Sequence, residues 1–372
     1  MRVIVIGAGL GGLTLAHGLR RAGIDVVVYE RDQARGRPQG VSLHFDDRGT
    51  TALRACLPPS HVAMAEATMG GPREQTLLLS EVDGEVTVSG ARPADGTVAR
   101  PGRQVSRRLL RAVLLCGLDD VVRFGKEFVW FDRRAGGTVL ARFADGGMDA
   151  ADVLVGADGI GSAVRRQYLP HVRVTDTGRH MLMGATPLRA AARGGLPALI
   201  GDSPAAARLR GTTMALGVHR FAEPPAAARD RWLPALHSPA IDDAEDYVMW
   251  ALPAAREHAR SPADSWRRAR ELTADLPPAL RLIVDEAWPE LTVSLRIGAI
   301  PPMPPWPAGP VTLIGDAIHL APGFGGNLAM RDAHRLRDVL RQADRGEREL
   351  LPAIGAYEET MRQDSFPVGH SA

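Results

Sequence analysis

Three glycines near the N-terminus have the spacing of a phosphate-binding turn. Gly7, Gly9 and Gly12 lie in the segment GAGLGG, directly after an apolar run and at the start of a helical pattern. In such a turn the first glycine permits the tight bend, the second lets backbone amides approach a pyrophosphate, and the third allows helix and strand to pack closely. Leu10 lies inside the turn, and we include it in the predicted dinucleotide site.

An acidic residue completes this pattern. Glu30 follows the apolar run DVVVY, and its carboxylate can accept hydrogen bonds from both hydroxyls of an adenosine ribose. A carboxylate at this position would repel a 2′-phosphate. We include the neighbouring Arg31 in the same site. These features leave FAD and NAD both possible, and a glycine-rich turn that binds nothing is the less favoured alternative.

Two later segments place an acid at the turn between a strand and a helix. They read DVLVGADGIGSAVRR, from residue 152, and GDAIHLAPGFGGNLAMRDA, from residue 315. A carboxylate at a strand end can bind sugar hydroxyls, and the free amides that open a helix can hold an anionic ring. Each segment taken singly could be an ordinary capped turn. At these two turns the residues assigned to the cofactor are Asp158, Gly159, Asp316 and Asn327.

Buried strands and helices must bring these turns together. Continuous apolar runs predict strands buried on both faces, as in a parallel sheet, and apolar residues at helical spacing predict the helices between them. The first strand, helix and strand would form a right-handed crossover. The predicted strands are 2–6, 25–29, 121–124, 127–131, 139–143, 152–155 and 311–314, and the predicted helices are 13–19, 105–116 and 327–340.

The middle of the chain differs from both ends in its sequence pattern. Between residues 176 and 298, β-like runs at 213–218 and 247–252 alternate with Ala/Pro/Arg segments and one helix near 266–276. The six prolines of 301–310 exclude a helix or a central strand and predict a rigid crossing back to the first lobe.

Composition excludes several classes of protein. The chain has 372 residues, of which 45% are hydrophobic and 24% charged, a soluble globular composition. Its net charge of +2 offers no field that would attract nucleic acid or a membrane surface. Cys56 and Cys116 cannot form a zinc site, and we predict that both are buried free thiols. No stretch reaches the length of a membrane span, so we expect a cytoplasmic protein.

Together the motifs resemble the single-component FAD-dependent aromatic-ring hydroxylases of the para-hydroxybenzoate hydroxylase fold. The resemblance covers nearly the whole chain and is specific in GAGLGG with Glu30, in ADGIGSAVR, and in GDAIHLAP followed by NLAMRDA. It implies that Asp158 and Gly159 lie near FAD, that Asp316 binds the ribityl chain, that Arg107 contacts the flavin, and that Gly325 and Gly326 border the flavin ring. The compact length and the segment GVSLHF are similar to the tetracycline-inactivating branch.

The resemblance also implies the architecture. We expect an α/β fold with a Rossmann-like FAD-binding domain of the GR2 type, an inserted sheet-bearing substrate domain and a C-terminal helix. The discontinuous FAD-binding domain would comprise residues 1–70, 100–175 and 299–372, and the substrate-binding domain residues 71–99 and 176–298.

The implied activity is that of a monooxygenase. NADPH or NADH would reduce FAD as a transient reductant, O2 would add at C4a, and the hydroperoxide would hydroxylate, epoxidise or otherwise oxygenate a secondary metabolite such as an aromatic polyketide. The partners would be O2 and an aromatic or polycyclic small molecule, without nucleic acid or membrane, in a monomer or homodimer.

One departure from the family keeps an alternative open. The loop 319–327, HLAPGFGGN, is a few residues shorter than the family's usual run, and it contains Pro322, a candidate catalytic residue beside the flavin. A tolerated loop deletion is the simpler explanation. The alternative is that FAD is structural and the pocket performs a non-redox cyclisation or rearrangement. A flavin reductase acting on isoprenoid double bonds is a third possibility.

The candidate substrate residues rest on weaker signals. His44 in GVSLHF could orient a substrate hydroxyl or remove its proton, although a structural histidine is the more common case. Arg208, Arg210 and Met249 could line a pocket for a flat substrate, but solvated arginines and core packing explain them equally well. We expect His319 to be a turn residue. No HExxH, cysteine cluster or GxSxG motif supports a metal enzyme or a serine hydrolase.

Overall fold

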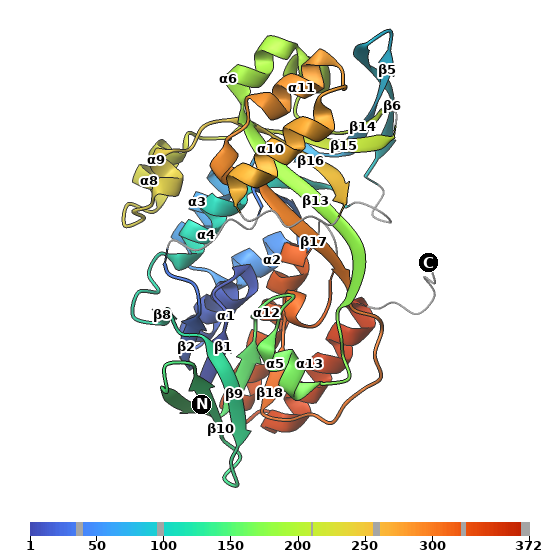
Figure 1. Cartoon of the computed structure of the whole chain (residues 1–372). Coiled ribbons are helices and arrows are strands. Elements are labelled where there is room, and N and C mark those ends of the chain that lie inside the picture. Colours follow the sequence, from blue (N-terminus) through green and yellow to red (C-terminus); the bar gives the residue numbers. More distant parts are fainter. Residues whose placement is uncertain (35–39, 95–99, 210, 256–260, 321–324, 366–372) are drawn as a thin grey trace.

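A five-stranded parallel sheet forms the centre of one lobe (Figure 1). The computed structural model describes residues 1–34, 40–94, 100–209, 211–255, 261–320 and 325–365. The strand order is β18-β12-β1-β2-β8, and the Val- and Ile-rich strands are buried because helices cover the sheet. Its predicted strands are confirmed. They are β1 (Arg2–Ile6), β2 (Asp25–Glu30), β8 (Val122–Phe124), β12 (Val153–Gly156) and β18 (Val311–Leu313).

Helices pack against this sheet. They include α1 (Leu10–Arg21), α12 (Gly325–Asp344) and α13 (Leu350–Ser365). The predicted helix 105–116 is shorter than expected, because its first two residues belong to strand β7 (Gly102–Ser106). Helix α4 (Arg107–Leu115) begins where the Ser106 hydroxyl accepts a hydrogen bond from the amide of Leu109.

A second lobe is built on a seven-stranded sheet of order β17-β13-β16-β15-β14-β5-β6. Its strands are β5 (Gln75–Val82), β6 (Glu85–Pro93), β13 (Thr175–Pro187), β14 (Pro204–Leu209), β15 (Thr212–His219), β16 (Tyr247–Ala255) and β17 (Val293–Ala299). Four helices lie over one face (Figure 1). They are α6 (Leu188–Ala191), α7 (Leu196–Ile200), α10 (Pro262–Thr273) and α11 (Pro278–Asp285). The expected domain boundaries stay a prediction.

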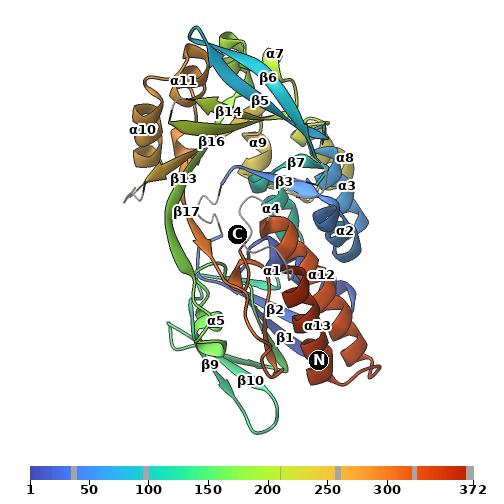
Figure 2. The same cartoon turned by 90° about the vertical axis from the view of Figure 1, so that its right-hand side faces the viewer.

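Two small sheets complete the fold. The order β11-β10-β9 joins β9 (Phe128–Arg133), β10 (Val139–Phe143) and β11 (Met148–Ala151), of which β11 was missed in the sequence. The order β3-β7-β4 joins β3 (Ser42–Asp46) and β4 (Pro72–Arg73) to β7. Figure 2 shows β3 and β7 between the seven-stranded sheet and the helices α4 and α12. The remaining helices are α2 (Asp47–Cys56), α3 (Pro59–Ala67), α5 (Ala163–Tyr168), α8 (Pro225–Trp232) and α9 (Pro239–Asp242).

The two cysteines differ in their surroundings. Both are free, as predicted, and Cys56 is fully buried. The prediction of burial was wrong for Cys116, which is half-buried because it follows the last residue of α4 and lines a surface hollow with His17 and His61. Among the helices of the described ranges, none is both long enough and apolar enough to cross a bilayer.

A buried carboxylate on α13 yields a stability prediction. Burial raises the pKa of Glu358 to about 7, although hydrogen bonds from Thr312 and Tyr168 favour the charged form. Since the ordinary value is 4.5, the folded chain keeps a proton that the unfolded chain releases between about pH 4.5 and 7. The free energy of unfolding should therefore fall as the pH rises through this window.

Glu358→Gln should remove most of this fall and raise the free energy of unfolding at pH 8 by up to about 3 kcal/mol. Urea denaturation at pH 5 and pH 8 measures the effect. Glu349→Gln, an exposed position just before the same helix, serves as the control and should leave the fall unchanged. An equal fall in wild type and Glu358→Gln would show that Glu358 does not titrate as described.

Candidate active site

The glycine turn lies between β1 and α1, and two of its glycines are sterically required. Gly7 has a φ of +110°, and a Cβ on it would lie 2.4 Å from the carbonyl oxygen of Ala157. A Cβ on Gly12 would lie 2.1 Å from the carbonyl oxygen of Gly7. A Cβ on Gly9, in contrast, would meet no atom within 4 Å. The backbone at Gly9 is therefore open to an approaching ligand, as a phosphate-binding turn requires.

Glu30 connects this turn to the end of β2. Its Oε2 accepts a hydrogen bond from the amide of Ala8 at 2.8 Å, and its Oε1 accepts one from the amide of Asp32 at 2.9 Å. Each carboxylate oxygen has a second lone pair, so Glu30 can still bind ribose hydroxyls. Arg31 is exposed and lies 3.9 Å from Asp32, at the outer side of the turn.

Helix α4 contributes two arginines, Arg107 and Arg111, to the region of Glu30 and Asp316. Burial lowers the pKa of Arg107, while the nearby Asp316 favours its charged form. Burial likewise lowers the pKa of Arg111, and Glu30 and Asp32 oppose this effect. Sequence reasoning identified Arg107 and missed Arg111. The spacing of four residues was the available signal, because it places both side chains on one face of the helix.

Asp316 is accessible to solvent although protein surrounds it on several sides. By surface area its side chain is exposed, yet burial raises its pKa against the opposing charges of Arg107 and His319. A carboxylate that lines a recess, rather than the outer surface, accounts for both the exposed side-chain area and the raised pKa. A Cβ on Gly325 would lie 2.7 Å from Asp316 Oδ1, so the carboxylate lies against the start of α12, where the helix dipole favours negative charge.

The start of α12 lies beside the glycine turn. A Cβ on Gly326 would come within 3.4 Å of Leu10 Cδ1, so Gly325, Gly326 and Leu10 are brought together. Asn327 has a structural role. Its Nδ2 donates to the carbonyl oxygen of His44 at 2.7 Å, and its Oδ1 accepts from the amide of Asp46 at 3.1 Å. The side chain therefore ties α12 to β3.

Asp158 also contacts backbone amides. Its Oδ2 accepts hydrogen bonds from the amides of Ala163, at 2.7 Å, and Val164, at 3.2 Å, and thereby caps α5. Burial raises its pKa. Its Oδ1 is buried without a hydrogen-bond partner among the described residues. Gly159 follows with a φ of +72°, a conformation that favours glycine.

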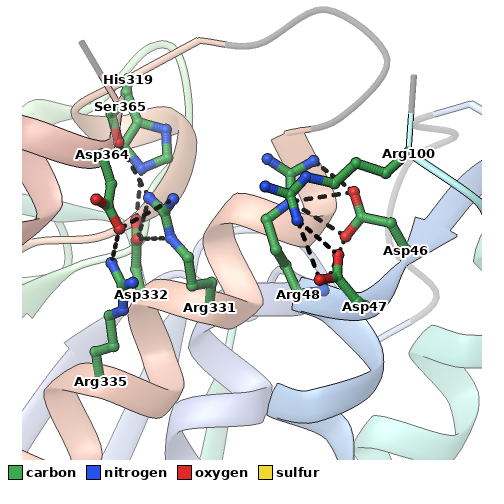
Figure 3. Close-up of polar contacts among 10 residues, drawn as sticks. All are labelled: Asp46, Asp47, Arg48, Arg100, His319, Arg331, Asp332, Arg335, Asp364 and Ser365. Carbon is green, nitrogen blue, oxygen red and sulfur yellow. Dashed lines mark hydrogen bonds and ion pairs between the residues drawn. The ribbon is translucent and has the colours of Figure 1, made fainter. Parts of the chain in front are cut away.

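A buried ion group holds the turn that carries Asp316 (Figure 3). Asp332 accepts hydrogen bonds from the amide of Gly315 at 3.0 Å and from Arg331 Nη2 at 3.1 Å, and its Oδ2 lies 2.5 Å from His319 Nε2. Burial raises the pKa of Asp332, but the charges and hydrogen bonds of His319 and Arg331 outweigh burial and lower it overall. Asp332 therefore acts as an ionised anchor, which sequence reasoning missed.

The predicted substrate residues do not all converge. Met249 lies on β16 beside Tyr247 and faces the first lobe. His44 lies on β3 as expected, and its Nε2 is 2.8 Å from the carbonyl oxygen of Arg100. Arg208 is exposed near the β5–β6 hairpin with Ser80 and Glu81, away from Met249. Pro322 and Arg210 lie outside the described residues, as do residues 321, 323 and 324 of the shortened loop. The roles of these residues stay predictions.

The bridge made by Asn327 can be tested by substitution. Asn327→Ala would leave two backbone groups of β3, the carbonyl oxygen of His44 and the amide of Asp46, without this partner, so we expect the free energy of unfolding to fall by roughly 2–3 kcal/mol. Asn327→Asp keeps the acceptor for Asp46 but cannot donate to the carbonyl oxygen of His44, and it should lose a similar amount or more. Urea denaturation measures both variants. Unchanged stability in both would contradict the bridge.

Comparison with known proteins gives the family. The chain is 30% identical to an FAD-dependent urate hydroxylase of Klebsiella pneumoniae, over 96% of this chain and 85% of that protein. It is 30% identical to a dual O-methyltransferase/FAD-dependent monooxygenase of Cercospora beticola, over 97% of this chain. The chain spans less than half, 44%, of the length of that relative.

A solved structure and a family model agree with these relatives. A protein of Photorhabdus luminescens, provisionally assigned as an FAD-containing monooxygenase, shares 29% identity with a TM-score of 0.78, over 98% of this chain and 94% of that one. The model described as FAD binding domain matches residues 1–193 and 302–360, more than half of the chain. The chain therefore belongs to the FAD binding domain family, and with it to the FAD-dependent hydroxylases of the para-hydroxybenzoate hydroxylase fold that its motifs resemble.

Proposed function

We propose that this chain is an FAD-dependent monooxygenase that uses NADPH or NADH and O2 to oxygenate a flat aromatic or polycyclic small molecule, such as a polyketide. The observation that carries the proposal is the convergence of Glu30, Arg107 and Asp316 with two helix starts at one edge of a parallel sheet. The carboxyl edge of such a sheet is where extended nucleotide cofactors bind.

Each group at this edge suits one part of FAD. The open backbone at Gly9 and the start of α1 would hold the pyrophosphate, and Glu30 the adenosine ribose. Asp316 would bind the hydroxyls of the sugar-alcohol chain, opposite Arg107. The amides of Gly325 and Gly326, at the positive end of α12, would stabilise negative charge on the ring. When bound, FAD supplies the redox and oxygen chemistry.

The seven-stranded sheet would supply the wall of the substrate chamber. Side chains on β16 alternate, so that Val248 and Trp250 point into the core beneath the helices while Tyr247 and Met249 point toward the first lobe. A Cβ on Gly40, just before β3, would lie 3.3 Å from Met183 Sδ on the same face. An apolar wall of this kind holds an aromatic substrate and excludes water from the reaction.

The redox role is tested with purified protein reconstituted with FAD. We expect yellow protein whose FAD is reduced by NADPH or NADH, and faster nicotinamide oxidation when a substrate is added. A product formed under isotopically heavy O2 should contain one heavy oxygen atom. Turnover under nitrogen without nicotinamide would instead support the non-redox alternative and reject a monooxygenase.

The proposed cofactor contacts are tested at Asp316. Asp316→Ala removes hydrogen bonds to the bound sugar-alcohol chain and should weaken FAD binding by roughly tenfold or more. Asp145→Ala, at an exposed hairpin turn where the carboxylate pairs with Lys126, is the matched control and should bind FAD as the wild type does. Fluorescence titration of the FAD-free protein gives both dissociation constants. Equal constants for the two variants would remove Asp316 from the proposed site.

A further inference from the structure

A cluster of buried polar side chains lies between the small sheet β3-β7-β4 and the face of the seven-stranded sheet that carries Tyr247 and Met249. We call it the Arg73 cluster. Its arginine is only 6% exposed and its glutamine 1% exposed, burial that is unusual for these residue types. The members are Ser42, Arg73, Gln104, His219 and Tyr247.

Hydrogen bonds account for only part of this cluster. Gln104 Nε2 donates to Ser42 Oγ at 2.8 Å, and Ser42 Oγ lies 2.7 Å from the hydroxyl of Tyr247. The His219 ring stacks on Tyr247 with ring centres 4.9 Å apart, and the backbone of Thr68 lies near it, outside hydrogen-bond geometry. Gln104 Oε1 is buried without a hydrogen-bond partner among the residues described. The cluster therefore retains an unused acceptor.

The positive charge of Arg73 is not balanced within the cluster. Across the described ranges no carboxylate forms an ion pair with it, and its guanidinium makes one long hydrogen bond, 3.4 Å from Nη2 to the carbonyl oxygen of Val218. Asp202 favours the charged form of Arg73 from a distance, but it is itself paired with Arg220. Removing an unpaired charge from water is costly.

The neighbouring titratable groups do not supply a negative charge. Burial raises the pKa of Tyr247 to about 12, so its hydroxyl stays protonated. Burial, with a further contribution from Arg73, lowers the pKa of His219 to about 3, so its ring stays neutral. The pKa of Arg73 itself is lowered by burial to about 10, which leaves it charged at neutral pH. The cluster therefore carries one net positive charge.

The guanidinium lies on the face of the seven-stranded sheet that carries Tyr247 and Met249. A Cβ on Gly217 would lie 2.6 Å from Arg73 Nη2 and 3.0 Å from Gln104 Oε1, so both groups lie directly over this glycine of β15. Gly217 is the strand partner of Met249. Because Gly217 has no side chain, there is room for the guanidinium of Arg73 beside Met249 on the apolar wall.

Arg103 shows what a purely structural arginine looks like here. It lies on β7, one residue before Gln104, and points to the other face of that strand. Its Nε donates to the carbonyl oxygen of Gly70 at 2.7 Å, and its Nη2 to that of Met69 at 3.2 Å. These two hydrogen bonds hold β7 to the backbone of Met69 and Gly70. Among the described residues, the guanidinium of Arg73 makes only the one long hydrogen bond to the backbone.

We propose that the Arg73 cluster is an anion-binding subsite of the substrate chamber, and that the substrate carries an anionic oxygen, as a carboxylate or an ionised phenol. The anionic oxygen would bind Arg73, and the flat body would lie along Met249 and Met183. The inference rests on the proposed function in that it takes this face as the substrate chamber. A guanidinium bound to an anionic oxygen forms charge-assisted hydrogen bonds, which are among the strongest in proteins.

Binding of matched ligand pairs to the FAD-loaded protein tests the proposal. The first pair is 2-naphthoate and 2-naphthamide, and the second is 4-nitro-1-naphtholate and its methyl ether. Isothermal titration calorimetry gives the four dissociation constants. We expect at least one anion to bind about tenfold or more tightly than its neutral partner, and the pair that shows this identifies carboxylate or phenolate as the preferred group.

Substitutions assign this preference to Arg73. Arg73→Met should reduce the ratio of the two constants to about one, and Arg73→Lys should keep part of it, because lysine retains the charge without the planar fork. Arg103→Met is the matched control, in which the ratio should persist even if the protein is less stable. If Arg73→Met does not fold, Gly217→Ala decides, since its methyl group displaces the guanidinium and should lower the ratio.

The proposal is overturned if neither anion is preferred by more than about threefold in the wild type. It is also overturned if the preference for the anion survives in Arg73→Met. If Arg73→Met does not fold, it is overturned if the preference survives in Gly217→Ala. Equilibrium binding does not depend on turnover. If the chain prefers anions but never oxidises NADPH or NADH, the monooxygenase is disproved and the anion-binding subsite stands. If the enzyme is active but does not prefer anions, the subsite is disproved and the monooxygenase stands.

Discussion

The close approach of two helix starts is the constraint on which the rest of the structure depends. A Cβ on Gly11 would lie 3.1 Å from the Cβ of Ala329, and one on Gly315 would lie 2.6 Å from the same atom. Only minimal side chains let α1 and α12 meet here, so both positive helix ends open toward the same edge of the parallel sheet. Two like helix ends in one place favour an anionic ligand, and they explain why Glu30 and Asp316 flank them.

Strand β3 links this edge to the second lobe. Leu43 and Phe45 pack into the apolar core of the first lobe, while Ser42, on the opposite face, reaches the hydroxyl of Tyr247 on the seven-stranded sheet. The side chain of Asn327 fixes this strand to α12 by hydrogen bonds to the backbone of the strand. One short strand therefore sets the distance between the proposed cofactor site and the proposed substrate chamber, and changes in its backbone would affect both.

Arginine carries the buried positive charge of both sites, in a chain whose sole lysine is Lys126. Arg107 and Arg111 lie near acids of the cofactor edge, where each charge is opposed. Arg73 lies on the other side of β3 and has no such acid at ion-pair distance in the described structure. The same side chain thus serves two purposes: beside a carboxylate it positions that group, and without one it is available to a ligand.

Local pattern alone determined the buried strands, the glycine turn with Glu30, and the family, because strand burial and tight turns depend on residues close together in the chain. The start of α4 was predicted two residues too early, since apolar spacing cannot distinguish the end of a strand from the start of a helix. Only the tertiary structure decided that Asn327 binds the backbone of Asp46, 281 residues away, and that Arg73 lies over Gly217. Such contacts depend on how distant strands pair, which no local spacing encodes.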